Sequence, residues 1–314
     1  MIAIRILRRA VLACAVLLAP SAISAQASRS ASARSRASAR AAEPEAVFTL
    51  LPHRTRWAID VQVGGKPFRF GFDTGGGLTL ISPAVARAAG CTPWGRVTGF
   101  QMMGQRLDAP RCDSVSITIG ANRFTPAVAP VIAQTDIEPN DKDLEGSLAL
   151  DVFAGRALTL DLAAGRLTLE SPASLAARVR TMTPLRVRVQ REMGGRALSL
   201  FTPVATARGE MWMELDSGNG GTLLVSKPYA ALLGLDSAAT GSQRGGFTVM
   251  PGVRAESEMI FTPDMIVDGN LGMPFLRRWI ITVDLATGRA WIAPAAPAAS
   301  PPQAPRTDSA RPIP

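Results

Sequence analysis

The positions of apolar residues along the chain predict a protein built almost entirely of short β-strands. Between residues 57 and 169, apolar residues alternate with polar ones, or run together, in segments that end at glycine or other turn-forming residues. Paired glycines at 64–65 predict a hairpin between the first two segments. The expected strands of this half are Trp57–Val63, Phe68–Phe72, Leu78–Ile81, Val115–Ile119, Ala157–Asp161 and Arg166–Leu169.

The same order of segments recurs after about residue 180, because the chain contains an internal repeat. Residues 70–90 (FGFDTGGGLTLISPAVARAAG) have a counterpart in residues 213–234 (MELDSGNGGTLLVSKPYAALLG). In each copy an apolar strand leads to Asp, a hydroxyl residue and Gly, and then to a second strand and a short helical segment, near 83–89 or 227–233. Self-similarity of this kind indicates two copies of one structural unit.

A second repeated element lies downstream in each half. Residues 146–170 match residues 269–293, and both contain the sequence Asp-Leu-Ala-x-Gly-Arg, which predicts a hairpin turn between two apolar strands. The first half carries about twenty more residues between its two elements than the second, and we expect them in hairpins within 92–145. The pattern predicts an all-β fold of two homologous lobes, residues 45–175 and 176–294.

The charge of the chain is concentrated at its N-terminus. The 314-residue sequence has a formal net charge of +9, and residues 1–42 hold seven arginines and no acidic residue. Subtracting these seven charges leaves +2 for the rest of the chain. No basic stripe with interleaved aromatic residues occurs there, which argues against a nucleic-acid partner.

Both ends of the chain differ in composition from a folded domain. Residues 1–27 combine arginines, a short apolar run and small residues, which is typical of a secretory signal peptide; an uncleaved membrane anchor is the alternative. Residues 28–44 are a low-complexity linker, either a removable pro-segment or a tether, and residues 295–314 form a Pro/Ala-rich disordered tail. We therefore expect a periplasmic or secreted protein that meets the membrane only through its signal segment.

Two cysteines remain once the signal segment, which contains Cys14, is removed. Cys91 and Cys112 lie 21 positions apart and are either a disulfide or two buried thiols. In the chain-entropy model a bridge over that distance stabilises the fold by about 3 kcal/mol.

The strongest candidate chemistry lies at the two repeated aspartates, Asp73 and Asp216. Each follows an apolar strand at the point where the chain turns, and each opens the same repeated unit, so the two lie at equivalent positions of the two lobes. Two carboxylates within about 3 Å of each other share one proton. The ionised member can then activate a water molecule while the protonated member donates to a substrate carbonyl.

The two residues after each aspartate fit such a pair. Gly75 and Gly218 lack a Cβ, so two turns of this kind can approach each other closely. The hydroxyl groups of Thr74 and Ser217 can donate hydrogen bonds to the opposite loop and so hold the pair in place.

These motifs resemble the active-site loops of retropepsin-like and pepsin-like aspartic peptidases. The match includes Phe-Asp-Thr-Gly at 72–75, Leu-Asp-Ser-Gly at 215–218, and Gly-x-Leu-Gly-x-x-Phe-Leu at 269–276, which is similar to the apolar-apolar-Gly element of those enzymes. The resemblance extends over about residues 47–293 and includes bacterial exported forms with two fused lobes.

The resemblance implies six-stranded, β-barrel-like lobes with the active site in the cleft between them and a flap hairpin above it. By position, residues 97–107 would be the flap, with Gly99 and Gly104 as turn residues, and residues 245–252 its second-lobe equivalent. Two features depart from the family pattern. Three glycines follow Asp73-Thr74, and Ala149 stands where the second copy has Gly272.

The sequence thus predicts an exported aspartic endopeptidase that cuts peptide or protein substrates as a monomer, without metal or cofactor. The alternative is a weak or inactive relative that binds peptides or scaffolds an envelope complex; the two halves could also pair between chains. The chain has a single histidine, His53, which is expected on the surface. It therefore lacks a histidine for a Ser-His-Asp site and the several histidines of a histidine-rich metal site.

Overall fold

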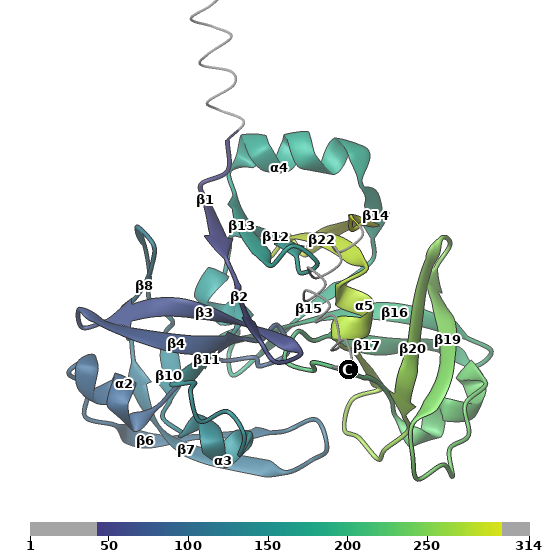
Figure 1. Cartoon of the computed structure of the whole chain (residues 1–314), viewed down its shortest axis with the longest axis horizontal. Coiled ribbons are helices and arrows are strands. Elements are labelled where there is room, and N and C mark those ends of the chain that lie inside the picture. The colour runs from purple at the N-terminus through teal and green to yellow at the C-terminus, as the bar shows by residue number, and fades with distance from the viewer. Residues whose placement is uncertain (1–42, 297–314) are drawn as a thin grey trace, which may run out of the picture. The chain divides into compact units, whose positions relative to one another are not determined.

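The computed structural model of the protein describes residues 43–296, which form short β-strands and a few short helical segments (Figure 1). The all-β fold expected from the alternating pattern is confirmed. The signal peptide, most of the linker and most of the C-terminal tail lie outside the described residues. Within 43–296, no helix has the length and apolar character needed to cross a membrane.

The first half of the chain is built on a seven-stranded sheet. The hairpin of its strands β3 (Arg56–Val63) and β4 (Lys66–Phe72) turns at Gly64 and Gly65, both with positive φ, where the paired glycines predicted a turn. In spatial order the strands are β5 (Leu80–Ile81), β11 (Gly146–Leu148), β4 (Lys66–Phe72), β3 (Arg56–Val63), β8 (Ile117–Ile119) and β9 (Asn122–Phe124), and β2 (Leu51–His53) also pairs with β3.

The second half has a seven-stranded sheet of its own. Its order is β15 (Arg188–Glu192), β16 (Ala197–Thr206), β17 (Gly209–Leu215), β21 (Gly269–Leu271), β18 (Leu223–Val225), β20 (Val253–Phe261) and β19 (Gln243–Met250). Each half thus has one strand more in its sheet than the six that the family resemblance implies.

Both halves place the strand that leads to the aspartate in the same surroundings. In the first half, β4 pairs in parallel with β11, and β11 pairs antiparallel with β5. In the second half, β17 pairs in parallel with β21, and β21 pairs antiparallel with β18. The repeated sequence elements therefore occupy matching positions in the two sheets.

A third sheet of six strands is shared by the two halves. Its order is β1 (Ala46–Thr49), β13 (Arg166–Glu170), β12 (Ala157–Asp161), β22 (Trp279–Asp284), β23 (Arg289–Pro294) and β14 (Thr183–Leu185). The hairpins β12–β13 and β22–β23 contain the two Asp-Leu-Ala-x-Gly-Arg turns. They meet in the β12–β22 pairing, where the equivalent hydroxyls of Thr159 and Thr282 lie 2.8 Å apart.

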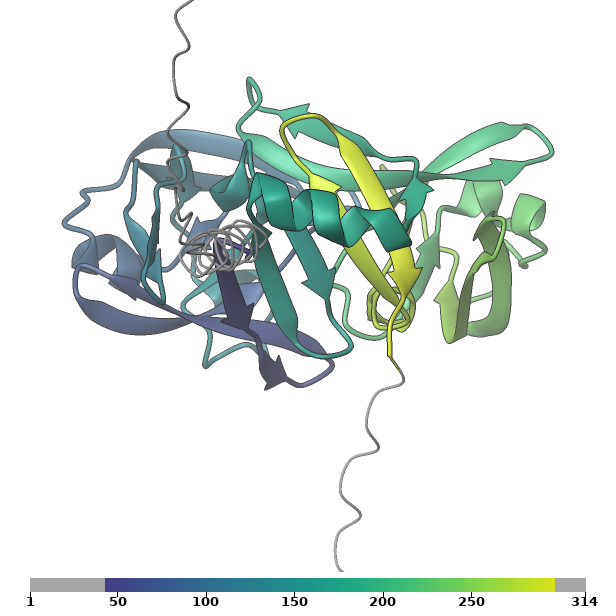
Figure 2. The same ribbon diagram turned by 90° about the horizontal axis from the view of Figure 1, so that it is seen from above.

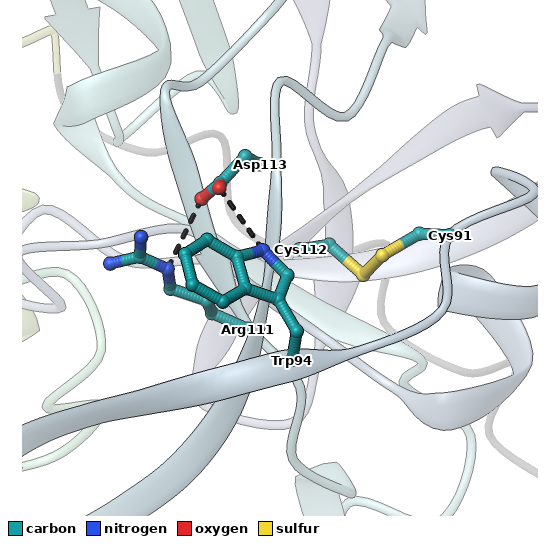
Figure 3. Close-up of a disulfide and its surroundings, with 5 residues drawn as sticks. All are labelled: Cys91, Trp94, Arg111, Cys112 and Asp113. Carbon is teal, nitrogen blue, oxygen red and sulfur yellow. Dashed lines mark hydrogen bonds and ion pairs between the residues drawn. A yellow bond between two sulfur atoms is a disulfide. The ribbon is translucent and has the colours of Figure 1, made fainter.

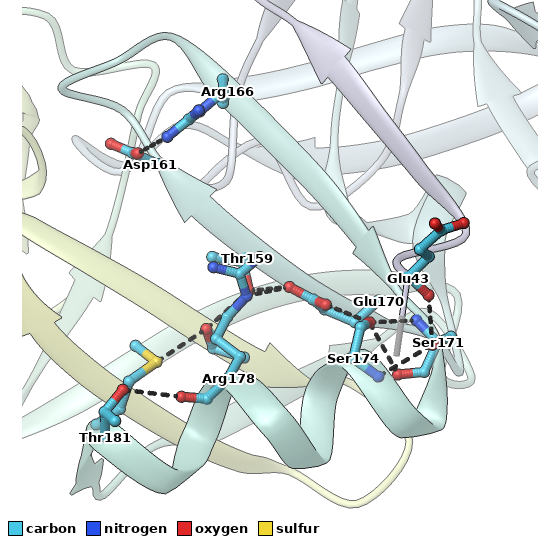
Figure 4. Close-up of polar contacts among 11 residues, drawn as sticks. Glu43, Thr159, Asp161, Arg166, Glu170, Ser171, Ser174, Arg178 and Thr181 are labelled. Atoms are coloured by element: carbon cyan, nitrogen blue, oxygen red, sulfur yellow. Dashed lines mark hydrogen bonds and ion pairs between the residues drawn. The ribbon is translucent and has the colours of Figure 1, made fainter. Parts of the chain in front are cut away.

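The helix α4 (Pro172–Arg178), continued by the 3₁₀ turn η2 (Val179–Thr181), runs across this shared sheet (Figure 2). Ser171 caps the helix by accepting from Ser174 N, at 3.0 Å, and Pro172 follows it. The buried carboxylate of Glu170 accepts hydrogen bonds from Thr159, Ser174 and Arg178, as Figure 4 shows. This network holds the helix to the sheet and satisfies a buried charge.

The other helical segments are short. The structure has α2 (Pro83–Ala88) where the sequence predicts a helix, and Ser82 accepts from Val85 N at its start. The matching segment of the second half, η3 (Lys227–Leu233), is a 3₁₀ helix without a side-chain cap that ends at Gly234 in the left-handed region. The remaining segments are α3 (Gln134–Ile137), η1 (Leu150–Phe153) and α5 (Met273–Leu276).

The first half also has a separate three-stranded sheet of β6 (Trp94–Phe100), β7 (Arg106–Asp113) and β10 (Val128–Pro130). The extra residues of this half lie after β7, where they form β8, β9, β10 and α3, because the second half has a β19–β20 hairpin in the place of β6–β7. A disulfide between Cys91 and Cys112 ties the segment after α2 to β7 (Figure 3). Beside it, Trp94 donates to Asp113 and lies beneath the Arg111 guanidinium. The bridge anchors the base of the β6–β7 hairpin, whose far end reaches toward the second half.

Candidate active site

The two aspartates lie where the sheets of the two halves meet. Asp73 directly follows β4, and its backbone N–H donates to Leu148 O at 3.0 Å. Asp216 directly follows β17, and its N–H donates to Leu271 O at 3.1 Å. Each is therefore held by the equivalent strand of its own half, β11 or β21.

The hydroxyl residues after the aspartates reach across to the opposite half. Thr74 Oγ1 donates to Leu215 O at 2.6 Å and accepts from Ser217 N at 3.0 Å. Ser217 Oγ donates to Phe72 O and accepts from Thr74 N, each at 3.0 Å. All four bonds are buried, so they bind the two loops together in a reciprocal arrangement that we call the cross-loop clasp.

The glycines of the two motifs bring each loop against the opposite carboxyl group. A Cβ on Gly75 would lie 2.7 Å from Asp216 Cγ, and a Cβ on Gly218 would lie 2.6 Å from Asp73 Oδ1. Contacts this short exclude any side chain at either position. The absence of a Cβ is therefore what allows both carboxyl groups to enter one site.

The two carboxyl groups lie within hydrogen-bonding reach of each other. Burial, the charge of Asp216 and the hydrogen bond to it raise the pKa of Asp73 well above the ordinary range of a carboxyl group. Gly75 N and the charge of Arg56 act in the opposite direction but do not cancel this effect. With its pKa raised to about 8, Asp73 keeps its proton through the acid and neutral range.

Asp216 receives more hydrogen bonds than Asp73. Its Oδ1 accepts from Gly218 N at 2.7 Å and from Asn219 N at 3.2 Å. Its Oδ2 accepts from the side-chain nitrogen of Asn270 at 2.7 Å. Asp73 accepts one backbone bond, from Gly75 N at 3.0 Å.

Three polar residues beside Asp216 were not singled out from the sequence: Glu214, Asn219 and Asn270. Glu214 is buried, and its pKa is raised well above the ordinary value, first by burial and then by the charges of Asp216 and Asp73. It faces Asn270 across the parallel pairing of β17 with β21. A comparison of the two repeats could have revealed these residues, because the second half has larger polar side chains at positions where the first half has Gly71, Gly76 and Ser147.

The two departures from the family pattern compensate each other in volume. In the first half, a Cβ on Gly76 would lie 3.0 Å from Asp73 Oδ2 and 3.6 Å from the Ala149 Cβ. In the second half, a Cβ on Gly272 would lie 2.4 Å from Thr222 O and 2.7 Å from Asn219 Cγ. The first half thus combines Gly76 with Ala149, and the second half combines Asn219 with Gly272 at the equivalent positions.

The expectation of a surface histidine is wrong. His53 is 7% exposed, and its Nε2 lies 3.1 Å from Oδ1 of the fully buried Asp141. Asp141 Oδ2 also accepts from Arg56 at 2.5 Å, and Arg56 in turn donates to Gly218 O at 3.4 Å. Arg56 thus links the β2–β3 turn to both the buried Asp141 and the second aspartate loop, through contacts between distant residues that the local sequence does not reveal.

The candidate flap is the β6–β7 hairpin. Gly104 lies in its turn with a φ of 84°, as expected. Gly99 does not lie in the turn, because it pairs with Leu107 and the ladder continues to Phe100 and Arg106. In the second half, residues 245–252 belong to the β19–β20 hairpin, which turns at Gly252.

The tip of the flap reaches the second half beside Asp216. Met102 O accepts from Ile266 N at 3.0 Å, and the Met102 sulfur lies 3.8 Å from the Asn270 side-chain nitrogen. Phe100 and Ile266 are each 62% exposed, so apolar side chains line the outer side of this contact. Among residues 43–296, no group of three or more His, Cys, Asp or Glu side chains is arranged to hold a metal ion.

Comparison with known proteins points in the same direction. Residues 59–152, which include Asp73 but not Asp216, match the model of a family described as aspartyl protease. The structure is similar to the crystal structure of basic 7S globulin from soybean, with a TM-score of 0.53 and 8% sequence identity over 79% of this chain and 94% of that chain. This likeness establishes the two-lobe, all-β fold. No curated protein matches the chain.

Proposed function

We propose that the protein is an aspartic endopeptidase whose catalytic residues are Asp73 and Asp216. The observation that supports this most strongly is the reciprocal arrangement of the two loops, in which the glycine of each motif abuts the other carboxyl group. The family match over the first half supports the same chemistry.

The reaction follows from a pair that holds one proton. The ionised carboxylate takes a proton from a water molecule, whose oxygen bonds to the carbonyl carbon of the substrate. The protonated carboxyl gives its proton to the carbonyl oxygen. When the tetrahedral intermediate collapses, the carboxyl group that took its proton from water gives that proton to the amine nitrogen as the C–N bond breaks. The other carboxylate takes a proton from a hydroxyl group of the intermediate as the C=O bond re-forms, so the pair again holds one proton.

The substrate is an extended peptide that lies between the two halves beneath the β6–β7 hairpin. The hairpin offers backbone groups to a peptide in strand conformation. The exposed apolar side chains of Phe100, Met103 and Ile266 beside the hairpin tip favour peptides with apolar residues. We further propose that the protein is exported to the periplasm or secreted and acts as a monomer.

The test is hydrolysis of a reduced, unfolded protein substrate between pH 3 and 7, with and without pepstatin. We expect cleavage that pepstatin inhibits and that Asp73→Asn and Asp216→Asn each reduce by at least about 10³-fold, within the range of acid–base catalysis. Asp60→Asn is the matched control, because Asp60 is an exposed carboxylate paired with Arg69.

Three outcomes separate the alternatives. Cleavage that survives either substitution would contradict the proposed catalytic pair. Pepstatin binding without cleavage would instead support an inactive relative that binds peptides. Sedimentation at micromolar concentration checks the monomer, because pairing of halves between chains would produce a dimer.

A further inference from the structure

The polar residues behind Asp216 give the two carboxyl groups different roles. We propose that Asn270, oriented by Asn219, is a positioning residue that makes Asp216 the ionised member of the pair and leaves the proton on Asp73. The proposal rests on the proposed function only for the catalytic consequence, that Asp216 activates the water and Asp73 donates to the carbonyl oxygen.

The orientation of Asn270 is determined by a chain of contacts that starts at Thr222. Thr222 donates to Asn219 Oδ1 from its backbone nitrogen at 3.2 Å and from its hydroxyl at 2.8 Å. The oxygen of the Asn219 amide must therefore face Thr222. Its nitrogen is left to donate to Thr222 O at 3.1 Å and to Asn270 Oδ1 at 2.8 Å.

Because the oxygen of Asn270 accepts from Asn219, its nitrogen must face Asp216. This nitrogen donates to Asp216 Oδ2 at 2.7 Å. If the amide were turned over, its oxygen would meet the carboxylate and its nitrogen would meet the nitrogen of Asn219, so both contacts would be repulsive. The network thus supplies a fixed N–H donor to Asp216.

Asp216 consequently accepts three N–H donors, two from backbone groups and one from Asn270. Hydrogen bonds from N–H groups stabilise the ionised form of a carboxyl group. Asp73 accepts a single one, from Gly75 N. With one proton to share, the negative charge is better stabilised on Asp216.

The first half has no counterpart of this network. The residues equivalent to Glu214, Asn219 and Asn270 are Gly71, Gly76 and Ser147. Ser147 faces Gly71 across the β4–β11 pairing, as Asn270 faces Glu214 in the second half. An asparagine in place of Gly76 would also crowd the carboxyl group of Asp73, because its Cβ would lie 3.0 Å from Asp73 Oδ2.

Of the two other ionisable groups near the pair, Glu214 is compatible with this assignment and Arg56 opposes it. Glu214 would repel a charge on Asp216 if it were ionised, but burial and the charges of Asp216 and Asp73 raise its pKa, which favours the neutral form. Arg56, from the β2–β3 hairpin, stabilises negative charge on Asp73 through space. That interaction favours ionisation of Asp73 and so opposes the proposal. The three N–H donors must stabilise a charge on Asp216 by more than Arg56 stabilises a charge on Asp73.

The test is a ¹³C NMR titration of protein labelled at aspartate Cγ, which needs no turnover. Asp73→Asn and Asp216→Asn assign the two signals. Between pH 4 and 6 we expect a carboxylate signal from Asp216 and a carboxylic acid signal from Asp73. Asn270→Ala should raise the titration midpoint of Asp216 by about one to two pH units, the value of a hydrogen bond to a charged group.

Matched variants keep the result interpretable. Ser147→Ala, at the equivalent position of the first half, should leave both midpoints in place. Asn219→Ala releases the orientation of Asn270 and should raise the Asp216 midpoint in the same direction by a smaller amount, which provides a second test if Asn270→Ala does not fold. In active protein, the acidic limb of the kcat profile should move up with the midpoint.

An ionised Asp73 beside a protonated Asp216, or an Asp216 midpoint unchanged by both asparagine substitutions, would overturn the proposal. A protein that titrates as expected but does not cut peptides would leave the charge assignment intact and contradict the proposed function alone.

Discussion

The two halves of the molecule present their aspartates in the same way but support them differently. Thr74 and Ser217 make equivalent bonds across the interface, and Gly75 and Gly218 make equivalent close approaches. Behind these loops the resemblance ends. The second half places three polar side chains beside Asp216, whereas the matching positions of the first half hold two glycines and a serine.

The first half has a buried carboxyl group of its own in a different place. Asp151, in η1, accepts from both the backbone nitrogen and the hydroxyl of Thr79, at 3.1 and 2.6 Å. The equivalent residue of the second half is Pro274, in α5. The four cross-loop bonds of Thr74 and Ser217 are symmetric, whereas the polar side chains behind the two aspartate loops have diverged.

The largest loss of stability is expected from changes in the cross-loop clasp of Thr74 and Ser217. Thr74→Val and Ser217→Ala each remove a hydroxyl and leave one backbone N–H and one C=O unpaired in the interior. At about 1–3 kcal/mol for each unpaired group, either variant should lose about 4 kcal/mol of stability in chemical denaturation.

Thr118→Val is the control, because Thr118 lies in the short strand β8 away from the clasp. Equal losses in the two clasp variants support the symmetry. A large loss in one variant and none in the other would show that the clasp acts from one side only.

A smaller effect is expected from Asp151, and it depends on pH. Burial raises the pKa of Asp151 to about 6 from an ordinary value of 3.8. Because the folded form binds its proton more tightly than the unfolded form, this group's contribution is complete below pH 4. It is lost as the pH rises to 6, by up to about 3 kcal/mol.

Asp151→Asn removes this titration. The difference in unfolding free energy between the wild type and Asp151→Asn should therefore change across pH 4–6 and be constant above pH 7. Urea denaturation at several pH values measures it. A constant difference from pH 3 to 8 would contradict the raised pKa.

The smallest loss of stability is expected at the equivalent positions 149 and 272, which hold Ala149 in the first half and Gly272 in the second. Gly272→Ala forces a Cβ against the backbone oxygen of Thr222 and should cost about 2 kcal/mol. Ala149→Gly in the first half removes a buried methyl without a clash and should cost about 1 kcal/mol. Thermal unfolding compares the two, and a Gly272→Ala variant as stable as the wild type would show that the second loop is not tightly packed.

Much of this organisation can be predicted from the chain itself. The expected strand Ala157–Asp161 coincides with β12, and the expected Trp57–Val63 differs from β3 by one residue. The two aspartate motifs are recognisable because each lies within a repeated local pattern. Such features depend on neighbouring residues, which a sequence shows directly.

The contacts that a sequence conceals are those between distant residues. Asn270 meets Asp216 across 54 positions because β17 and β21 pair in parallel, and the register of that pairing is not visible in either strand. His53 is buried because Asp141, 88 positions away, lies beside it. The family resemblance places Gly99 in the turn of the flap by position, but the strand ladder extends past it to Phe100 and Arg106.

The central claim is that Asp73 and Asp216 act as one pair with one proton between them. The most direct measurement is the pH dependence of kcat/KM between pH 2 and 9 on a short synthetic peptide. A shared proton predicts a bell-shaped profile, because activity falls at low pH when the pair gains a second proton and at high pH when it loses its proton. Neither Asp→Asn variant should be active. A profile with a single limb, or activity retained in one of the two variants, would contradict the claim.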